Sequence, residues 1–291
     1  MTESMSHRGP DDSGLWTDFK FGLGFGHRRL SVLDLSSKGH QPMFSKSNRY
    51  VLIYNGEIYN HRELRRYLES FCKNKKIIWK GTSDTETLLE GFELLGVEKM
   101  LNNTIGMFSF ALWDEKKQEL LAARDPFGIK PFYFYKDKNL FYFASEIKAF
   151  FAAGIKIKPN YKKIHEFLRW GVLNFDNSTW FKDIYSLQPG HYIKLKKNRI
   201  IIKKYYYLPE KVNGIKEINL NSAKEKFSDL IVKSIKKHSR SDRSIGIHLS
   251  GGVDSSVISA VASKVIGRKI KNYTFGFKSK KFDERYFAEK I

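Results

Sequence analysis

The residues whose types and spacing best suit chemistry lie in one short stretch, Ser250 to Ser256, with the sequence SGGVDSS. It separates two apolar segments, IGIHL and VISAVASKVIG, so the pattern predicts a strand, a glycine turn and a helix. Glycines let a backbone approach an anion closely, the first amides of a helix point outward, and three serine hydroxyls add donors. The stretch therefore predicts a phosphate-binding loop, without the lysine of a Walker loop. The competing interpretation is a plain strand-to-helix turn capped by serine and Asp254.

A second group of polar residues is spread over the first half of the chain. Its motifs are, in order, HRGPD at 7–11, HRRLS at 27–31, NGEIYN at 55–60, GTSDTE at 81–86, RDPFG at 124–128 and ASE at 144–146. Taken singly, each has an ordinary structural interpretation. Arg29 can be half of a surface basic pair, Asn55 and Gly56 can form a hairpin turn, and Asp84 can favour the positive end of its helix.

Taken together and in this order, these motifs resemble the glutamine amidotransferase domain of the N-terminal-nucleophile class. The later loop resembles the pyrophosphate-binding loop of ATP pyrophosphatases, and the combination resembles the glutamine-hydrolysing asparagine synthetase family from Met1 to Ile291. The resemblance implies glutamine-dependent amidation of aspartate, driven by ATP with Mg²⁺ through β-aspartyl-AMP, that yields asparagine, glutamate, AMP and pyrophosphate. It implies glutamine, aspartate and ATP as small-molecule partners, and a homodimer as the oligomeric state.

The resemblance also implies the members of two sites. Arg29 would grip the α-carboxylate of glutamine, Glu57 with Asp84 its ammonium group, and Asn55 with Gly56 the developing oxyanion. The full glutamine site would comprise Arg29, Leu30, Ser31, Val32, Asn55, Gly56, Glu57 and Asp84. The nucleotide and pyrophosphate site would comprise Leu249, Ser250, Gly251, Gly252, Asp254, Ser255, Ser256 and Phe275, with Asp254 as a magnesium ligand. Leu249 and Phe275 could equally be strand core, and Asp254 a helix cap.

The chain departs from the family pattern at its first residue. Family members hydrolyse glutamine with a cysteine that begins the mature chain, whereas this sequence begins at Met1, with HRGPD already at position 7. We therefore expect no catalytic nucleophile, because Cys72 carries no terminal amine and follows an amphipathic helix. Later family segments would lie beyond Ile291. The sequence is thus expected to be a fragment truncated at both ends and inactive by itself.

Two other functions stay open at this point. One is a paralogous amidotransferase that acts on another carboxylate, for example in surface-polysaccharide synthesis. The other is a non-catalytic remnant that binds glutamine, a partner subunit or, through its net charge of +21, a polyanion. Phosphoribosyl and hexose-phosphate amidotransferases share the first domain but would not carry SGGVDSS before an α/β pattern.

Composition limits the classes of protein to be considered. The 291 residues carry 52 Lys and Arg against 31 Asp and Glu, a formal net charge of +21, and 41% are hydrophobic. The apolar content predicts a globular fold, and the lysines are spread along the chain, which favours a general lysine bias over a nucleic-acid groove. One cysteine, Cys72, excludes an internal disulfide, and the longest charge-free run, Leu101 to Trp113, is too short to cross a bilayer. We expect a cytoplasmic protein.

The length predicts about two domains. Strand patterns dominate up to Leu208, and after Pro209 helix and strand alternate, as in a parallel α/β sheet. We place the boundary between Pro209 and Asn221. The expected fold is an α+β amidotransferase domain with antiparallel sheets over 1–208, lacking its first strand and nucleophile, and the start of an α/β ATP-pyrophosphatase domain with a parallel sheet over 215–291.

Local patterns predict the elements that must hold these residues. In the first domain the pattern predicts a strand at 50–54 that ends in a tight turn at Asn55 and Gly56, a helix over 64–71, and an antiparallel meander over 105–144. Ser83 and Glu86 form a capping-box pattern for a helix that Gly96 closes. Further helices are expected at 145–153 and 159–170, and a hairpin at 191–208 that turns at Lys197 and Asn198. The second domain should begin with a helix over 223–235 and a strand over 245–249.

Overall fold

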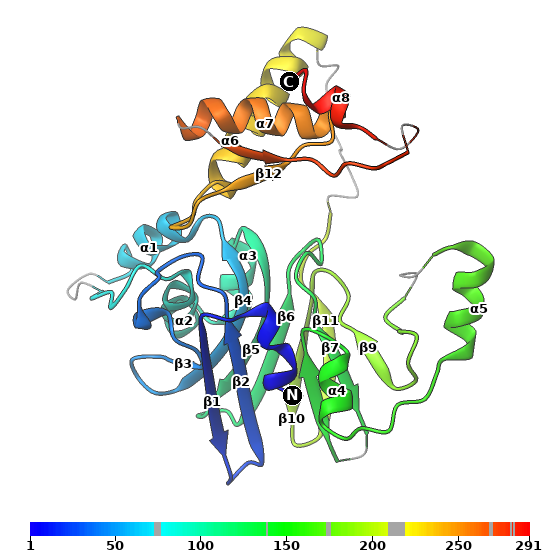
Figure 1. Cartoon of the computed structure of the whole chain (residues 1–291). Coiled ribbons are helices and arrows are strands. Elements are labelled where there is room, and N and C mark those ends of the chain that lie inside the picture. Colours follow the sequence, from blue (N-terminus) through cyan, green and yellow to red (C-terminus); the bar gives the residue numbers. More distant parts are fainter. Residues whose placement is uncertain are drawn as a thin grey trace. The chain divides into compact units, whose positions relative to one another are not determined.

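The computed structural model describes residues 1–72, 77–137, 139–172, 176–208, 219–267, 270–279, 281 and 283–291. Its contacts divide the chain into two compact units, Met1–Leu208 and Pro209–Ile291 (Figure 1). The predicted boundary region, 209–221, lies outside the described residues as far as position 218. Each unit is described by itself.

The first unit is built around a six-stranded antiparallel sheet with the order β11-β10-β6-β5-β4-β3. Its strands are β3 (Met43–Phe44), β4 (Tyr50–Ile58), β5 (Gly106–Asp114), β6 (Glu119–Arg124), β10 (His191–Lys196) and β11 (Arg199–Lys204). The hairpin of β10 and β11 confirms the prediction, because both turn residues, Lys197 and Asn198, have positive φ. Two positive φ values suit the primed turns that match strand twist.

Side chains alternate between the two faces of this sheet and make two separate cores. One face, with Leu52, Phe110 and Leu121, packs against the helices through Leu88, Phe92 and Met100. The opposite face carries Val51, Ala111, Trp113, Ala122 and Ile193, and it packs against Phe25, Phe132 and Phe134. The sheet is therefore a buried central layer, with helices on one side and further strands on the other.

The further strands form two small sheets. β1 (Asp12–Asp18) pairs with β2 (Leu23–Arg29), and β7 (Tyr133–Lys136) pairs with β8 (Phe141–Ala144) and β9 (Ile184–Ser186). The prediction of one continuous meander over 105–144 is therefore wrong, since β5 and β6 belong to the large sheet and β7 and β8 to the three-stranded one. The segment after Arg124 carries the chain from the large sheet to the three-stranded one.

The predicted turn at Asn55 and Gly56 is also wrong. β4 runs through both residues as far as Ile58, with Asn55 opposite Ser109 and Gly56 opposite Phe108. A Cβ atom on Gly56 would lie 2.8 Å from the Phe108 Cα atom and still closer to the Met107 carbonyl oxygen. The glycine is therefore required by the close approach of β5, and not by a reversal of the chain.

The helices of the first unit follow the predicted order. They are α1 (His61–Glu69), α2 (Asp84–Leu95), α3 (Val97–Asn103), α4 (Lys148–Ala152) and α5 (Tyr161–Trp170); the pattern had not indicated α3. Gly96 closes α2 as predicted. The capping box is wrong in detail, because Ser83 Oγ accepts from the Thr85 amide, and the Glu86 carboxylate accepts from the Lys80 and Gly81 amides instead of that of Ser83.

The second unit contains α6 (Leu220–His238), β12 (Gly246–His248), α7 (Val253–Ile266), β13 (Lys271–Tyr273) and α8 (Arg285–Ala288). β12 and β13 pair in parallel, as the alternating pattern predicts. The structure thus contains a two-stranded piece of the expected parallel sheet. Over the described residues of the whole chain, no helix has the length and apolarity needed to cross a membrane.

Candidate functional site

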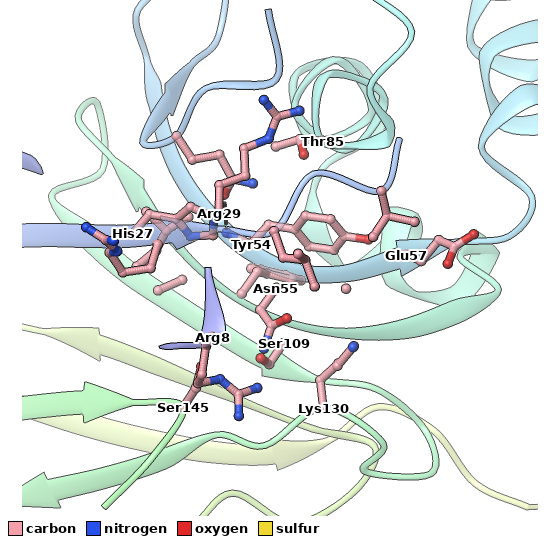
Figure 2. A pocket seen from close by; sticks show the side chains of 18 of the residues that line it. Arg8, His27, Arg29, Tyr54, Asn55, Glu57, Thr85, Ser109, Lys130 and Ser145 are labelled. Carbon is pink, nitrogen blue, oxygen red and sulfur yellow. Dashed lines mark hydrogen bonds between the residues drawn. The ribbon is translucent and has the colours of Figure 1, made fainter. Parts of the chain in front are cut away.

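A cavity of about 270 Å³ opens in the first unit, and most of the residues predicted to bind glutamine line it. Arg29, Leu30 and Val32 reach it from the end of β2, Asn55, Gly56 and Glu57 from β4, and Asp84 from the first turn of α2. Figure 2 shows the polar side chains of this cavity. Ser31 is buried beside it, with its amide donating to Asp11 Oδ2 at 2.8 Å, and is not one of the lining residues.

Asn55 lies in the middle of the cavity wall. It faces Ser109 across the ladder of β4 and β5, so both side chains project from the same side of the sheet. Figure 2 shows the Asn55 amide directly beside Ser109. The following residue, Gly56, exposes backbone to the cavity without a side chain. Asn55 and Gly56 together present a side-chain amide and a main-chain N–H at one position of the cavity wall.

Arg29 is buried, with 7% of its surface exposed, and it organises the loop that follows β2. Its guanidinium donates to the carbonyl oxygens of Leu33 at 3.3 Å and Ser36 at 2.8 Å, and also to that of Asp34. In Figure 2 it extends toward Thr85, at the start of α2. A guanidinium has five N–H donors in a planar fork, so these three bonds leave donors for a ligand.

Asp84 is also buried, and two donors hold its carboxylate in place. Oδ2 accepts from the Tyr54 hydroxyl and from the Ile58 amide, each at 2.8 Å. Burial raises the pKa of Asp84, although both hydrogen bonds act in the opposite direction. A cationic group that enters the cavity would therefore stabilise this carboxylate strongly.

The start of α2 is fixed by Arg65. Its guanidinium stacks 4.1 Å from the Trp79 ring centre and donates to the Gly81 and Ser83 carbonyl oxygens at 2.9 and 2.8 Å. A second tie comes from Asp34, whose Oδ2 accepts from the Thr82 amide at 2.8 Å. This contact links the loop that Arg29 organises to the segment that presents Asp84.

Other lining residues were given no role by the sequence analysis, although Arg8, His27 and Ser145 lie in motifs that it singled out. They include Arg8, His27, Ser109, Lys130 and Ser145. His27 is the most perturbed of them, since burial lowers its pKa to about 4, with the Arg29 charge contributing in the same direction. The imidazole is neutral at pH 7. For Lys130 a signal existed, because it follows the RDPFG motif by two residues.

Asp125 explains how Lys130 reaches the cavity. Its carboxylate is fully buried and accepts from the amides of Phe127, Ile129 and Lys130 at 3.0, 3.0 and 2.9 Å. It also accepts from the Phe108 amide at 3.2 Å. This one side chain folds the segment after β6 into a tight loop against β5. The loop carries the chain from the large sheet to β7 and turns Lys130 toward the cavity.

Cys72, the single cysteine, lies just beyond the end of α1 and is not among the residues that line this cavity. It offers no replacement for a nucleophile there. The N-terminal segment contributes Met5 and Arg8 to the wall from the 3-10 helix η1 (Glu3–Arg8).

The predicted phosphate loop in the second unit has the local form that the sequence indicates. It joins β12 to α7, and Gly251 has a φ of +81°. The serine hydroxyls bond within the loop: Ser250 Oγ lies 3.0 Å from Ser255 Oγ, and Ser256 Oγ donates to the Gly252 carbonyl oxygen at 2.6 Å. A Cβ on Gly251 would lie 2.7 Å from the Ala288 amide nitrogen, so only glycine fits there.

The remaining predicted nucleotide-site residues differ in exposure. Leu249 is buried and continues β12, with its amide donating to the Tyr273 carbonyl oxygen at 2.9 Å. Phe275 is 75% exposed and stacks on His248 with a ring separation of 5.7 Å. Asp254 is exposed in the first turn of α7. Within the described residues there is no group of three or more His, Cys, Asp or Glu side chains that could hold a metal.

Residues 1–206 match the family of glutamine amidotransferase domains. The chain belongs to this family. In addition, residues 226–291 match the asparagine synthase family. The predicted resemblance, an amidotransferase domain followed by an asparagine synthase segment, is therefore confirmed.

Two of the proteins that resemble this chain in sequence are asparagine synthetases of Bacillus subtilis. It is 36% identical over 267 residues to asparagine synthetase [glutamine-hydrolyzing] 3 of Bacillus subtilis, which covers 90% of this chain and 42% of the relative. It is 35% identical over 286 residues to asparagine synthetase [glutamine-hydrolyzing] 1 of the same organism, covering 98% of this chain and 43% of the relative. The chain thus spans less than half the length of these relatives.

Among solved structures, the amidotransferase-family fold resembles the glutamine phosphoribosylpyrophosphate amidotransferase of B. subtilis complexed with ADP and GMP. The TM-score is 0.52 at 18% identity, over 96% of this chain and 64% of the other. At this identity the likeness concerns the fold alone. It confirms the expected α+β class with antiparallel sheets; for the expected ATP-pyrophosphatase domain, the structure contains the single parallel strand pair.

Proposed function

We propose that this chain is part of a glutamine-dependent asparagine synthetase. Its first unit would bind glutamine, and its second unit would bind ATP, which would activate aspartate as β-aspartyl-AMP before amidation to asparagine, with release of glutamate, AMP and pyrophosphate. The observation that supports this most is the cavity of the first unit. Three segments far apart in sequence contribute Arg29, Asn55 with Gly56 and Glu57, and Asp84 to its wall.

The chemistry of these groups matches the three polar ends of glutamine. We propose that the Arg29 fork binds the α-carboxylate and that Asp84 with Glu57 binds the α-ammonium group. The Asn55 amide and the Gly56 N–H would stabilise the oxyanion that develops when the side-chain amide is attacked. Leu30, Ser31 and Val32 would complete the site through the backbone after β2.

For the second unit we propose a nucleotide site at the loop between β12 and α7. The amides at the start of α7 and the hydroxyls of Ser250, Ser255 and Ser256 suit a pyrophosphate group. Magnesium fits this donor set, because Mg²⁺ is commonly held by one or two carboxylates and substrate phosphates, and Asp254 is an exposed carboxylate there. When bound, the ion would neutralise phosphate charge.

We also propose domain boundaries, a cellular location and an oligomeric state. The amidotransferase domain would span 1–208, and the ATP-pyrophosphatase part would begin near 215. Leu249 and Phe275 would flank the nucleotide. We propose a cytoplasmic homodimer that uses small-molecule substrates.

Thermal unfolding with and without glutamine tests the first site. All five tryptophans lie within residues 1–208, so their fluorescence reports this unit. We expect saturating glutamine to raise the unfolding midpoint by several degrees, since a ligand at 100 times its Kd adds about 2.7 kcal/mol. The shift should disappear in Arg29→Lys and Asp84→Asn and persist in Arg62→Lys, which changes an exposed arginine of α1. A folded chain that shows no shift with glutamine would contradict the proposal.

A further inference from the structure

The ASE motif at 144–146 ends in a glutamate that has no role in the proposed glutamine site. Glu146 lies between the end of β8 and the start of α4, and the Ala149 amide donates to its carbonyl oxygen at 3.2 Å. The preceding residue, Ser145, lines the cavity of the first unit, whereas Glu146 is not among the lining residues. Glu146 therefore adjoins the cavity wall without forming part of it.

The Glu146 carboxylate holds three basic side chains. Oε1 lies 3.0 Å from both Arg8 Nη1 and His7 Nε2, and Oε2 lies 3.3 Å from Lys148 Nζ. Partial burial raises the pKa of Glu146, but the hydrogen bonds from these side chains outweigh this effect and lower the pKa to about 2. The carboxylate is thus charged at neutral pH. Of its three partners, Arg8 is the one that lines the cavity.

Arg8 belongs to the part of the wall that holds Asn55. Both residues line the cavity, together with Lys130. In Figure 2 the Arg8 guanidinium lies on the same side of the cavity as Lys130, whereas Arg29 points away from both. In the proposed function Arg29 binds the α-carboxylate and Asn55 faces the amide that is attacked. Arg8 and Lys130 would then lie at the side-chain end of the ligand.

The two cations at this end are opposed by carboxylates. Arg8 is paired with Glu146 at 3.0 Å. Burial and the Arg8 charge lower the pKa of Lys130, while the charges of Glu57 and Asp125 act in the opposite direction. The positive charges at the side-chain end are therefore balanced by negative charges of the protein itself.

A cavity end with balanced charge discriminates between an amide and a carboxylate. A charged group that leaves water loses far more hydration free energy than a neutral group, and it regains that free energy only from an opposite charge that is not already compensated. Because Arg8 is paired with Glu146, a ligand carboxylate would meet a compensated guanidinium. A neutral amide needs no such counter-charge.

We infer that Glu146 is a specificity-determining residue of this cavity: it neutralises Arg8, and the cavity consequently favours the neutral side chain of glutamine over the carboxylate of glutamate. The inference rests on the proposed function, because the cavity must first bind the α-amino acid group. It adds a residue that acts through Arg8 and does not touch the ligand.

The test is the ratio of L-glutamate affinity to L-glutamine affinity, measured by isothermal titration calorimetry on the 291-residue chain. We expect the wild-type chain to bind glutamine more tightly. Glu146→Gln should raise the ratio about fivefold, because it leaves the Arg8 charge uncompensated near the ligand side chain. Glu146→Asp keeps the negative charge and should leave the ratio near its wild-type value.

Two further variants separate the effect of charge from a loss of structure. Arg8→Gln should lower the ratio, because it leaves the Glu146 charge uncompensated, and the double variant Arg8→Gln with Glu146→Gln should return the ratio to near its wild-type value. A loss of structure would weaken both ligands in all three variants and would not move the ratio in opposite directions. Glu98→Gln is the matched control, because Glu98 is also ion-paired, with Lys194 at 3.0 Å, and is not among the residues that line the cavity.

The outcomes separate this inference from the proposed function. If glutamine binds but the wild-type chain prefers glutamate, or if Glu146→Gln leaves the ratio unchanged or lowers it, the role of Glu146 is wrong and the glutamine site stands. If the chain binds neither amino acid, both claims fail. Tryptophan fluorescence establishes that each variant is folded. If Glu146→Gln does not fold, Arg8→Gln decides, because an unchanged or higher ratio in that variant would also overturn the inference.

Discussion

In the first unit the polar residues of the cavity are held by a buried core, whereas in the second unit the loop residues are held by their own backbone. Asp84, Arg29 and Asp125 are all buried. Asp84 is held by Tyr54 and Ile58 of β4, and Asp125 ties its own loop to the Phe108 amide of β5. The serines of the 250–256 loop bond to each other and to Gly252. α6 has no buried residue, with Phe227 and Leu230 about two-thirds exposed at 66% and 65%.

The cavity of the first unit and the 250–256 loop therefore obtain their geometry in different ways. The cavity depends on long-range packing, because strand pairing sets Asn55 against Ser109, and Asp125, just after β6, ties its loop to Phe108 of β5. The loop depends on local chemistry, because the conformation of Gly251 and hydrogen bonds among its serines and Gly252 define it within seven residues. Changes in the core of the first unit should therefore affect its site far more than equivalent changes affect the loop.

The largest loss of stability is expected for Asp125→Ala. The substitution leaves four backbone amides, those of Phe108, Phe127, Ile129 and Lys130, without their buried acceptor. We expect the free energy of unfolding of the first unit to fall by roughly 3–5 kcal/mol. Urea titration followed by tryptophan fluorescence measures it.

Asp137→Ala is the control for this change, because Asp137 accepts from the Asn139 and Leu140 amides in an exposed turn. It should cost less than about 1 kcal/mol. Equal losses in the two variants would show that the buried acceptor has no special role, which would contradict the expected dependence of the cavity on buried contacts.

A smaller effect is expected for Gly56→Ala. The added Cβ would press on Phe108 Cα and on the Met107 carbonyl oxygen, which are backbone atoms of β5 and cannot move independently. We expect a loss of about 1–3 kcal/mol in the same urea titration. Gly24→Ala in β2 is the matched control, because its nearest neighbours would lie 3.8 Å away. A Gly56→Ala variant as stable as Gly24→Ala would mean that a turn, and not a strand, passes through this residue.

The smallest effect on the first unit is expected for Gly251→Ala, which lies in the second unit. A φ of +81° costs an L-residue about 1–2 kcal/mol, and the Cβ would also approach Phe287 and the Ala288 amide. Gly267→Ala has a similar φ of +64° with no described atom within 4 Å, so it isolates the contribution of conformation.

The second unit contains no tryptophan, so the local stability of the Gly251→Ala and Gly267→Ala variants is measured by amide hydrogen exchange in α7. Faster exchange should remain confined to this unit, with the fluorescence midpoint of the first unit unchanged. A shift of that midpoint by Gly251→Ala would contradict the view that the loop is stabilised locally.

Much of the fold could be predicted from local patterns. The α2 helix, the β10–β11 hairpin and the alternation of helix and strand after β12 all follow from periodicity and turn residues. The prediction of a turn at Asn55 and Gly56 was wrong because an Asn-Gly dipeptide is compatible both with a hairpin turn and with two strands that approach each other closely. The prediction of one meander was wrong because alternating hydrophobicity identifies strands but not the sheet to which each strand belongs.

The candidate site divides in the same way. Motif order pointed to Arg29, Asn55, Glu57 and Asp84, all of which line the cavity. Lys130 and Ser109 were missed, since Ser109 has no distinctive local pattern and the position of Lys130 just after the RDPFG motif does not by itself show which way the residue faces. Their relevance depends on what lies opposite them in space, which is a property of strand register and loop folding.

The order of motifs along the sequence identifies the family, and most of the helices and the local form of the 250–256 loop follow from residues within a few positions of each other. The packing of distant segments shows that Gly56 lies within a strand, that Asp125 directs the chain between two sheets, and that Lys130 lines the same cavity as Asn55. These features depend on contacts between segments far apart along the chain. Burial then gives such contacts their strength, because a polar group removed from water must find its partner within the protein.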